Sequence, residues 1–180
     1  MKKINLFIAA IALSIGLSAQ TYSEGDNLVN IGFGLGATFV TGSSTIPPLS
    51  ASFEHGFTDK ISAGGLIGYS GSKEEFAAFG GTWTYKYSYI IVGARGSYHF
   101  FSTDQIDAYG GAFLGYNIGN SKVTNDGTGN NLIQPAAANV GGVAYGLHVG
   151  GRYYFSDSFG AFGELGYGIS YLTLGVTMKL

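Results

Sequence analysis

The stretch 171–180, YLTLGVTMKL, alternates large apolar side chains with polar or small ones. Leucine, valine and methionine occupy the even positions from Leu172 to Leu180, and tyrosine, threonine, glycine and lysine occupy the odd positions. A period of two is that of a β-strand, whose successive side chains point to opposite faces of the sheet. One apolar face and one polar face predict a strand with lipid on a single side.

The stretch 28–40, LVNIGFGLGATFV, repeats this pattern near the other end of the chain. Its odd positions are apolar, and its even positions after Leu28 are glycine, asparagine, threonine or a final valine. The stretch is longer than the roughly 9–11 residues that a tilted membrane strand needs. In a soluble lipocalin-like barrel, large apolar side chains would fill the inside. The small second face instead fits a narrow lumen, and favours a membrane barrel over a soluble one.

Six further segments show the alternation, so the sequence predicts eight strands. Short turns alternate with longer polar loops, which is typical of outer-membrane barrels. The orientation of the fifth strand stays open, because Tyr109 and Phe113 compete with Ala108 and Leu114 for the lipid face. The predicted fold is an all-β, eight-stranded antiparallel transmembrane up-and-down β-barrel. The six segments are 49–54, 61–69, 85–99, 106–117, 143–153 and 159–168, and the longer loops are 41–48, 71–82 and 118–139.

Residues 1–20 predict a secretory signal peptide, which leaves residues 21–180 as the barrel domain. The segment begins Met-Lys-Lys, continues with an apolar run from Ile4 and ends in small residues beside Ala19 and Gln20. The run is too short for a spanning helix, which needs about 20 apolar residues. Loss of Lys2 and Lys3 would leave a mildly acidic chain, which argues against a nucleic-acid partner. The absence of cysteine excludes disulfides and thiolate metal sites.

The chain resembles the small outer-membrane β-barrel proteins of the OmpA/OmpX type from about residue 27 to residue 180. The resemblance rests on the N-terminal segment, the alternating strands, the terminal strand and glycine-aromatic runs such as AYGGAFLGY at 108–116. It implies a barrel without the peptidoglycan-binding domain, assembled by the barrel-assembly machinery. The last strand of that family usually ends in an aromatic residue, whereas this chain ends in Leu180. One barrel fold hosts many roles, so the resemblance implies architecture more than function.

Ionisable residues at inward positions are the candidate site. An unpaired buried ion costs several kcal/mol, so we expect salt bridges and hydrogen bonds that plug the barrel. Arg152 and Glu164 flank one short turn, and Arg95 and Asp107 flank another. The alternative is a charged constriction that selects ions or acts as a gate. The predicted network is Glu54, Arg95, Asp107, Arg152 and Glu164; His99, His148 and Lys179 also face inward, with His148 isolated in the lumen.

Small residues occupy the inward positions above these charges. One interpretation is a water-filled pocket open to the outside. The simpler one, which we favour, is that glycine allows tight curvature of the sheet and neighbouring tyrosine side chains fill the space. The small residues are Gly34, Gly36, Thr38, Ser50, Gly68, Ser70, Ala144 and Gly146.

No motif for catalysis, a cofactor or a metal is evident. His55, His99 and His148 are too scattered for a metal site, and nothing in their spacing predicts that a Ser-His-Asp set converges. The run GFGLG at 32–36 lies inside a predicted strand with no helix after it, unlike a dinucleotide-binding loop. Aromatic residues near the strand ends predict girdles at the membrane interfaces rather than a ligand-stacking surface. They are Tyr69, Trp83, Tyr85, Tyr87, Tyr98, Tyr116, Tyr153 and Tyr167.

The sequence thus predicts a non-enzymatic, structural and surface-displaying protein with a plugged narrow lumen, in the outer membrane of a Gram-negative bacterium. The alternatives are a narrow porin-like channel or a barrel that binds a small solute, with a lipid-modifying enzyme less favoured. Expected partners are outer-membrane lipid and lipopolysaccharide. Loops 71–82 and 118–139 would lie outside the cell, where a host, phage or matrix partner could bind.

Overall fold

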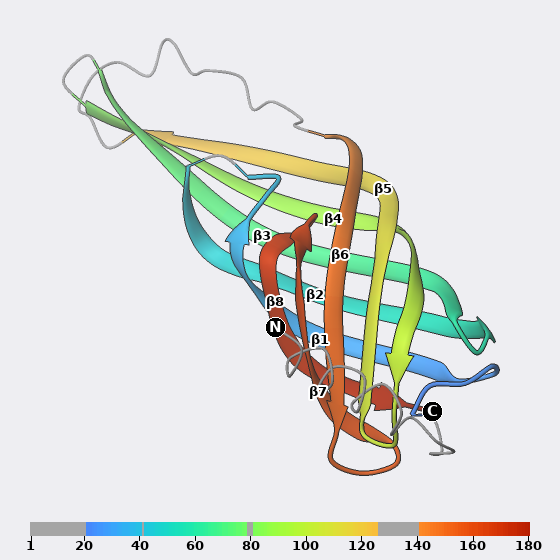
Figure 1. Cartoon of the computed structure of the whole chain (residues 1–180). Coiled ribbons are helices and arrows are strands. Elements are labelled where there is room, and N and C mark those ends of the chain that lie inside the picture. Colours follow the sequence, from blue (N-terminus) through green and yellow to red (C-terminus); the bar gives the residue numbers. More distant parts are fainter. Residues whose placement is uncertain (1–20, 41, 79–80, 126–140) are drawn as a thin grey trace, which may run out of the picture.

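The computed structural model describes residues 21–40, 42–78, 81–125 and 141–180, which form eight strands of one antiparallel sheet. Each strand pairs with the next along the chain, and β1 pairs with β8 to close the barrel (Figure 1). Closure leaves the barrel part of the sheet without free edges and pairs its backbone polar groups internally. The strands are β1 (Asn27–Ala37), β2 (Ser43–Thr58), β3 (Ile61–Ala78), β4 (Gly81–Ser102), β5 (Ile106–Asn125), β6 (Gly142–Tyr154), β7 (Phe159–Tyr167) and β8 (Ser170–Lys179).

The predicted eight-stranded antiparallel up-and-down barrel is confirmed. The expected signal peptide, residues 1–20, lies outside the described residues. Within the described part of the chain, no helix is long and apolar enough to cross a membrane.

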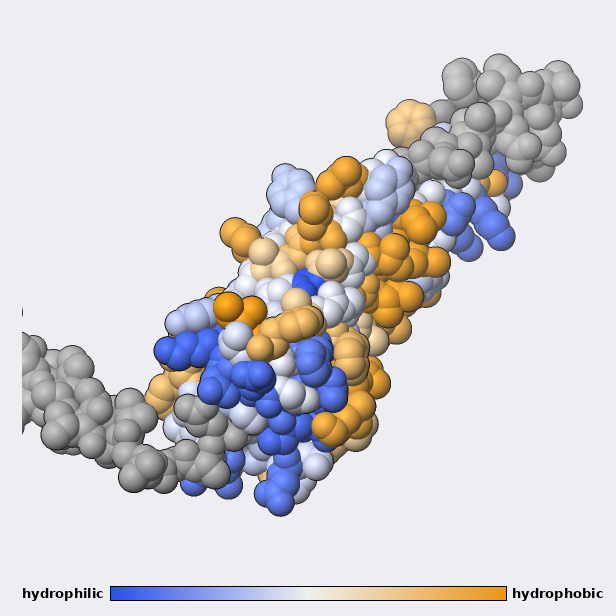
Figure 2. Space-filling model, turned by 90° about the vertical axis from the view of Figure 1, so that its right-hand side faces the viewer, coloured by the Kyte–Doolittle hydropathy of each residue, from blue (hydrophilic) through white to orange (hydrophobic). Residues whose placement is uncertain are grey.

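The outer wall of the barrel is apolar. Leu147, Val143 and Leu114 are 70%, 67% and 64% exposed, and the odd positions of β1 and β6 that were expected to face outward do so. Figure 2 shows this wall as an orange band with blue, hydrophilic atoms toward both ends. Soluble monomers rarely expose contiguous apolar areas of this extent, so the wall indicates a lipid or protein environment.

The orientation of β5, which the sequence left open, follows from the burial of its aromatic rings. Tyr109 and Phe113 are buried inside the barrel, whereas Leu114 and Tyr116 are exposed on the wall. The outward positions in the first half of β5 are therefore occupied by the small residues Ala108, Gly110 and Ala112.

Strands β3, β4 and β5 continue well past the rest of the barrel at one end (Figure 1). We call residues 71–78, 81–88 and 120–125 the β3–β5 extension. The expected loop 71–82 was wrong, because β3 runs to Ala78 and β4 begins at Gly81. The expected loop 118–139 starts with strand residues up to Asn125, and the rest of it lies outside the described residues. A strand with polar residues on both faces lacks the apolar alternation that identifies a membrane strand.

The loop expected at 41–48 was also wrong from residue 43 onward. Strand β2 begins at Ser43 and pairs with β3 through register shifts between Ser44 and Ile46 and between Ile46 and Leu49. Pro47 and Pro48 lie at the second of these shifts. Proline is tolerated at irregular positions of a strand because no ladder hydrogen bond is required there.

Five of the eight aromatic residues expected in girdles lie on the barrel wall, with exposures between 37% and 51%. Trp83, Tyr85 and Tyr87 do not, so this part of the expectation was wrong. They lie in the β3–β5 extension and share the inward face of β4 with Arg95. The ring centroids of Tyr85 and Tyr87 are 6.4 Å apart, and those of Tyr87 and Tyr89 are 6.2 Å apart. The five on the wall are Tyr69, Tyr98, Tyr116, Tyr153 and Tyr167.

Candidate functional site in the barrel lumen

The five predicted lumen residues lie on five different strands and converge inside the barrel. Glu54 lies on β2, Arg95 on β4, Asp107 on β5, Arg152 on β6 and Glu164 on β7. We call these five residues the charge network. Three carboxylates face two guanidinium groups, and the Glu54, Asp107 and Arg152 side chains are completely buried. A buried ion is tolerated only when it is paired and its remaining hydrogen-bonding capacity is used.

Arg152 is the hub of the lower part of the network. Its Nη1 donates to Asp107 Oδ2 at 2.6 Å, and its Nη2 donates to Glu54 Oε1 at 3.3 Å. Its Nε donates to Asn30 Oδ1 at 3.2 Å, and the guanidinium carbon lies 3.9 Å from the ring centroid of Tyr109. All three nitrogens of the guanidinium are therefore engaged, and its face is covered by an aromatic ring.

Arg95 connects Glu54 to Glu164 in the upper part of the network. Its Nε lies 3.1 Å from Glu54 Oε1, and its Nη2 donates to Glu164 Oε1 at 2.8 Å. The same Nη2 lies 2.9 Å from His148 Nε2, so His148 is not isolated as the sequence had suggested. The hydroxyl of Tyr109 donates to Glu164 Oε1 at 2.8 Å and so links the two parts of the network.

The ion pairs are not between the residues that flank a shared turn. Arg152 contacts Asp107, its direct register partner across β5 and β6. On its other side, Arg152 is opposite Phe162, and Glu164 is opposite Gly150. This offset of two residues separates Arg152 from Glu164 along the barrel, and Glu164 contacts Arg95 from across the lumen instead.

Polar residues that the sequence analysis did not single out complete the network. Ser62 and Ser97 donate to Glu54 Oε2 at 2.9 and 2.7 Å, and Asn30 donates to Ser52 Oγ at 3.0 Å. Their inward parity on already predicted strands was a usable signal. Along a strand, the residues next to an outward-facing residue point into the lumen, so polar residues at those positions are candidates for the same network.

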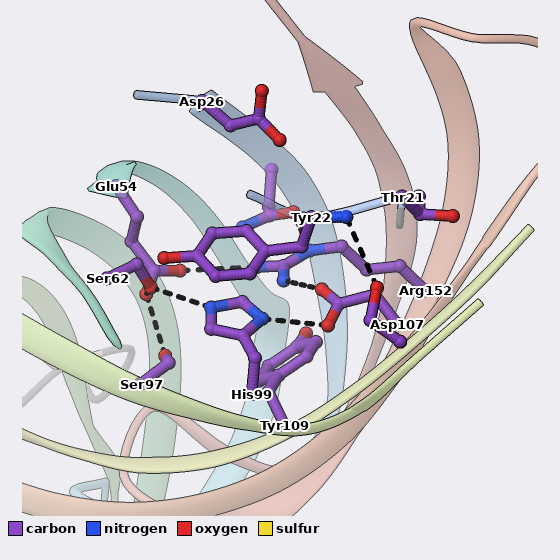
Figure 3. Close-up of polar contacts among 12 residues, drawn as sticks. Thr21, Tyr22, Asp26, Glu54, Ser62, Ser97, His99, Asp107, Tyr109 and Arg152 are labelled. Atoms are coloured by element: carbon purple, nitrogen blue, oxygen red, sulfur yellow. Dashed lines mark hydrogen bonds and ion pairs between the residues drawn. The ribbon is translucent and has the colours of Figure 1, made fainter. Parts of the chain in front are cut away.

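Ser62, His99 and Asp107 form a hydrogen-bonded chain in the order of a catalytic triad, which the sequence spacing had not suggested (Figure 3). His99 Nε2 lies 2.9 Å from Ser62 Oγ, and His99 Nδ1 lies 2.7 Å from Asp107 Oδ1. All three residues are buried, and the serine hydroxyl also contacts Glu54. A serine nucleophile needs access to substrate and donors for the oxyanion. In this arrangement Ser62 is fully buried and its hydroxyl is engaged by a carboxylate.

The N-terminal segment, residues 21–26, closes the barrel end that carries the short turns. Tyr22 is fully buried, and its ring lies parallel to the imidazole of His99 with centroids 3.5 Å apart (Figure 3). Its hydroxyl donates to Thr58 O at 2.9 Å, and burial, followed by the charges of Asp107, Glu54 and Asp26, raises its pKa. The Lys179 ammonium donates to Thr21 O at 3.1 Å. No periodic pattern marked this segment in the sequence.

Apolar side chains fill the lumen above the network. Ile91, Phe113 and Ala144 form a buried cluster with Phe39, Leu66 and Ile169 packed against it. A Cβ atom added at Gly68 would collide with Ile169, and one at Gly146 would collide with Phe113. The small inward residues thus make room for packed side chains, as favoured. Phenylalanine and isoleucine lie beside Gly146 and Gly68, and the buried ring of Tyr89 lies opposite Ser70.

A small cavity of about 50 Å³ lies between this apolar layer and the network. Arg95, His148, Glu164 and Phe113 are among the residues that line it. The volume is enough for one or a few water molecules. Among the described residues, no group of histidine, aspartate and glutamate side chains is arranged to hold a metal ion.

No protein-family model and no curated protein matches this sequence. Similar solved structures do exist. The N-terminal β-barrel domain of Pseudomonas aeruginosa OprF is 16% identical, with a TM-score of 0.53, over 88% of this chain and 99% of that one. The outer membrane protein OprG from the same species is 10% identical, with a TM-score of 0.57, over 88% of this chain and 97% of that one.

The Yersinia pestis attachment invasion locus protein Ail, in complex with the heparin analogue sucrose octasulfate, is 13% identical with a TM-score of 0.52. The match covers 87% of this chain and 95% of Ail. At such identities the likeness concerns the fold alone. The chain has the fold of small outer-membrane β-barrels.

Proposed function

We propose that this chain is a non-enzymatic integral protein of the outer membrane of a Gram-negative bacterium, with a lumen closed to ions and solutes. The apolar outer wall supports the membrane location, because a lipid environment removes the cost of exposing that wall. The shared fold with outer-membrane barrels supports it as well. Lipid and lipopolysaccharide would then be its immediate surroundings, and the barrel-assembly machinery would insert it.

The observation that carries the closed lumen is the charge network together with the layers on either side of it. Arg152 is 1% exposed and uses its whole guanidinium on partners from other strands. The N-terminal segment lies below this layer and the apolar cluster lies above it. A channel needs a continuous water path, and a cavity of about 50 Å³ does not provide one.

Planar-bilayer recording on the refolded protein tests this proposal against the porin-like alternative. We expect no discrete current steps from the wild-type barrel. Single-channel steps in the wild type that change with Arg95→Ala or Arg152→Ala would mean that the charges line a conducting path, and the closed lumen would be wrong. The heat-dependent gel migration of folded barrels identifies the preparations in which the protein is inserted and folded.

The non-enzymatic part of the proposal is tested at Ser62. A fluorophosphonate probe labels serines that a histidine activates. We expect no labelling of the wild type, because Ser62 is fully buried and its Oγ lies 2.9 Å from both Glu54 Oε2 and His99 Nε2. Labelling that disappears in Ser62→Ala would instead support a hydrolase. A separate assay tests the lipid-modifying alternative: the protein is incubated with lipopolysaccharide, and loss of acyl chains is measured.

The β3–β5 extension is the part that we propose to display outside the cell. Its inward face carries Trp83, Tyr85 and Tyr87, and an open groove of about 680 Å³ lies beside Tyr85, Tyr87 and Glu74. Partly exposed aromatic rings beside a groove favour binding of an external partner over a purely structural role. Adhesion of cells that display the wild type but not Tyr85→Ser/Tyr87→Ser would support this role. Equal adhesion of both would remove it.

A further inference from the structure

Three lysines form a row across the β3–β5 extension. Lys73 on β3 is the register partner of Lys86 on β4, and Lys86 is the register partner of Lys122 on β5. All three side chains belong to the outward face, because their positions have the same parity as the wall residues Tyr69, Ile90 and Ile118 on the same strands. The row is thus on the face opposite the aromatic residues of the extension.

Such a row is unfavourable without a counter-ion. Like charges directly opposite each other on neighbouring strands destabilise a sheet. Lys73 is paired with Glu75 at 2.8 Å, but both side chains of that pair are about half exposed. No described residue forms an ion pair with Lys86 or Lys122, and both are exposed. The row therefore keeps a net positive charge in a chain that is acidic overall, which indicates an anionic ligand.

The position of the row indicates where that anion comes from. On the outward face, the cross-strand row of Tyr69, Ile90 and Ile118 is apolar, with exposures of 37%, 38% and 46%. The next outward row is small and polar, and the lysine row follows. Four residues of strand cover about 13 Å, which a strand tilt near 40° reduces to about 10 Å in height. The middle row is Gly71, Ser88 and Asn120.

A height of about 10 Å above the apolar wall is at the outer edge of the lipid headgroup region. The headgroup region adds several ångströms to each side of a hydrocarbon core of about 30 Å. Lysine side chains are long enough to lower their ammonium groups toward that level. A free anion would not require the apolar row beneath it, so the arrangement favours a headgroup over a soluble phosphate.

We propose that Lys73, Lys86 and Lys122 bind the phosphate groups of lipids in the outer leaflet. This inference rests on the proposed membrane location. It specifies the site and the chemistry: three ammonium groups in one row, opposite a headgroup that carries more than one phosphate. Bound phosphate would offset the repulsion within the row and hold the extension at a defined height above the bilayer.

Lipid retention by the refolded barrel in a nonionic detergent tests the proposal, measured by native mass spectrometry at low salt. The probes are bisphosphorylated lipid A, the same lipid A without phosphates, phosphatidylcholine and inorganic pyrophosphate. We expect the wild type to prefer bisphosphorylated lipid A. The variant Lys73→Gln/Lys86→Gln/Lys122→Gln should bind it on the order of a hundredfold more weakly, because each lysine near a charged lipid surface contributes roughly fivefold.

Two matched variants separate charge from general damage. Lys73→Arg/Lys86→Arg/Lys122→Arg keeps the charge and should retain lipid A. Lys60→Gln removes a lysine from the turn at the opposite end of the barrel and should also retain it. Unchanged lipid A affinity in the triple glutamine variant would overturn the proposal, and so would binding of pyrophosphate as tight as that of lipid A.

The membrane location is tested independently by insertion into phosphatidylcholine vesicles. If the wild type fails to insert, the proposed function fails. If wild type and triple glutamine variant insert equally and bind lipid A equally, only the lysine site is wrong.

Discussion

The ring of Tyr22 lies against the imidazole of His99, with centroids 3.5 Å apart and planes at 7°. These residues are far apart in the sequence, and the contact joins the segment before β1 to the interior of β4. Because His99 also contacts Asp107 and Ser62, the stacked tyrosine covers the lower surface of the polar layer. The N-terminal segment is thereby part of the barrel interior.

Replacement of Tyr22 tests how much this cover contributes to stability. Tyr22→Ala should lower the free energy of unfolding by about 3 kcal/mol, because a large buried aromatic side chain is lost. Tyr22→Phe keeps the ring and loses only the hydrogen bond to Thr58, so it should cost about 1 kcal/mol. The measurement is the urea midpoint in detergent, followed by circular dichroism. Equal midpoints for wild type and Tyr22→Ala would show that the segment is not seated as described.

Alkaline pH should weaken the same contact. Burial raises the pKa of Tyr22 above its ordinary value of about 10. Above that pH the unfolded chain releases a proton that the folded protein retains, so the free energy of unfolding falls as pH rises. Below about pH 10 the stabilising contribution of the buried Tyr22 phenol is fully present. The fall above pH 10 should be steeper in wild type than in Tyr22→Phe, measured by urea unfolding across that range. Parallel pH curves would contradict a buried phenol at this position.

Loss of Arg152 should destabilise the barrel strongly. Arg152→Ala leaves Asp107 and Glu54 buried without one of their cationic partners, a change that typically costs about 3–5 kcal/mol. Adding Glu54→Gln to the same variant should recover part of the loss, because one stranded charge is removed. Lys60→Ala, in a turn, is the control and should leave the urea midpoint unchanged. An Arg152→Ala midpoint equal to that of wild type would argue against the charge network.

Two adjacent glycines of β3 should respond differently to alanine. A Cβ atom at Gly64 would collide with the Phe53 carbonyl oxygen, whereas one at Gly65 has Gly93 O at 3.9 Å as its nearest neighbour. Gly64→Ala should therefore cost about 1–3 kcal/mol, and Gly65→Ala should stay within about 0.5 kcal/mol of wild type. Refolding yield and urea midpoint measure both. Equal effects would mean that the two positions do not face opposite sides.

The single tryptophan reports whether the β3–β5 extension leaves the bilayer. Trp83 lies in the extension, so in vesicles its fluorescence should be quenched by aqueous iodide and not by brominated acyl chains. The matched probe is Tyr69→Trp in a Trp83→Phe background, since Tyr69 lies on the apolar wall. That variant should show the reverse preference. Quenching of Trp83 by brominated lipid would instead place its side chain in the interfacial girdle that the sequence analysis predicted.

Side-chain parity within each strand could be predicted from the sequence. The alternation in β1, β6 and β8 identifies their outward-facing residues, because the pleat of a strand sends successive side chains to opposite faces whatever its neighbours are. The same parity placed Glu54, Arg95, Arg152 and Glu164 on the inside. In β5 it failed to decide, because Tyr109 and Leu114 have similar apolar character and opposite parity.

Strand lengths in the extension could not be predicted. Residues 71–78 carry Lys73 and Glu75 on one face and Ser72 and Glu74 on the other, and a strand with water on both sides has no apolar period. The position of Trp83 was misjudged for the same reason, since its distance from the membrane depends on how far β3 and β4 continue to pair.

The sequence by itself determined that this chain folds into strands with an apolar outer face and a polar inner face, because that information is local and repeats every two residues. Only the tertiary structure decided which charges meet, that Tyr22 covers His99, and that Lys73, Lys86 and Lys122 form a row. Those relationships depend on strand register and on closure of the sheet, which bring together residues that no local period connects.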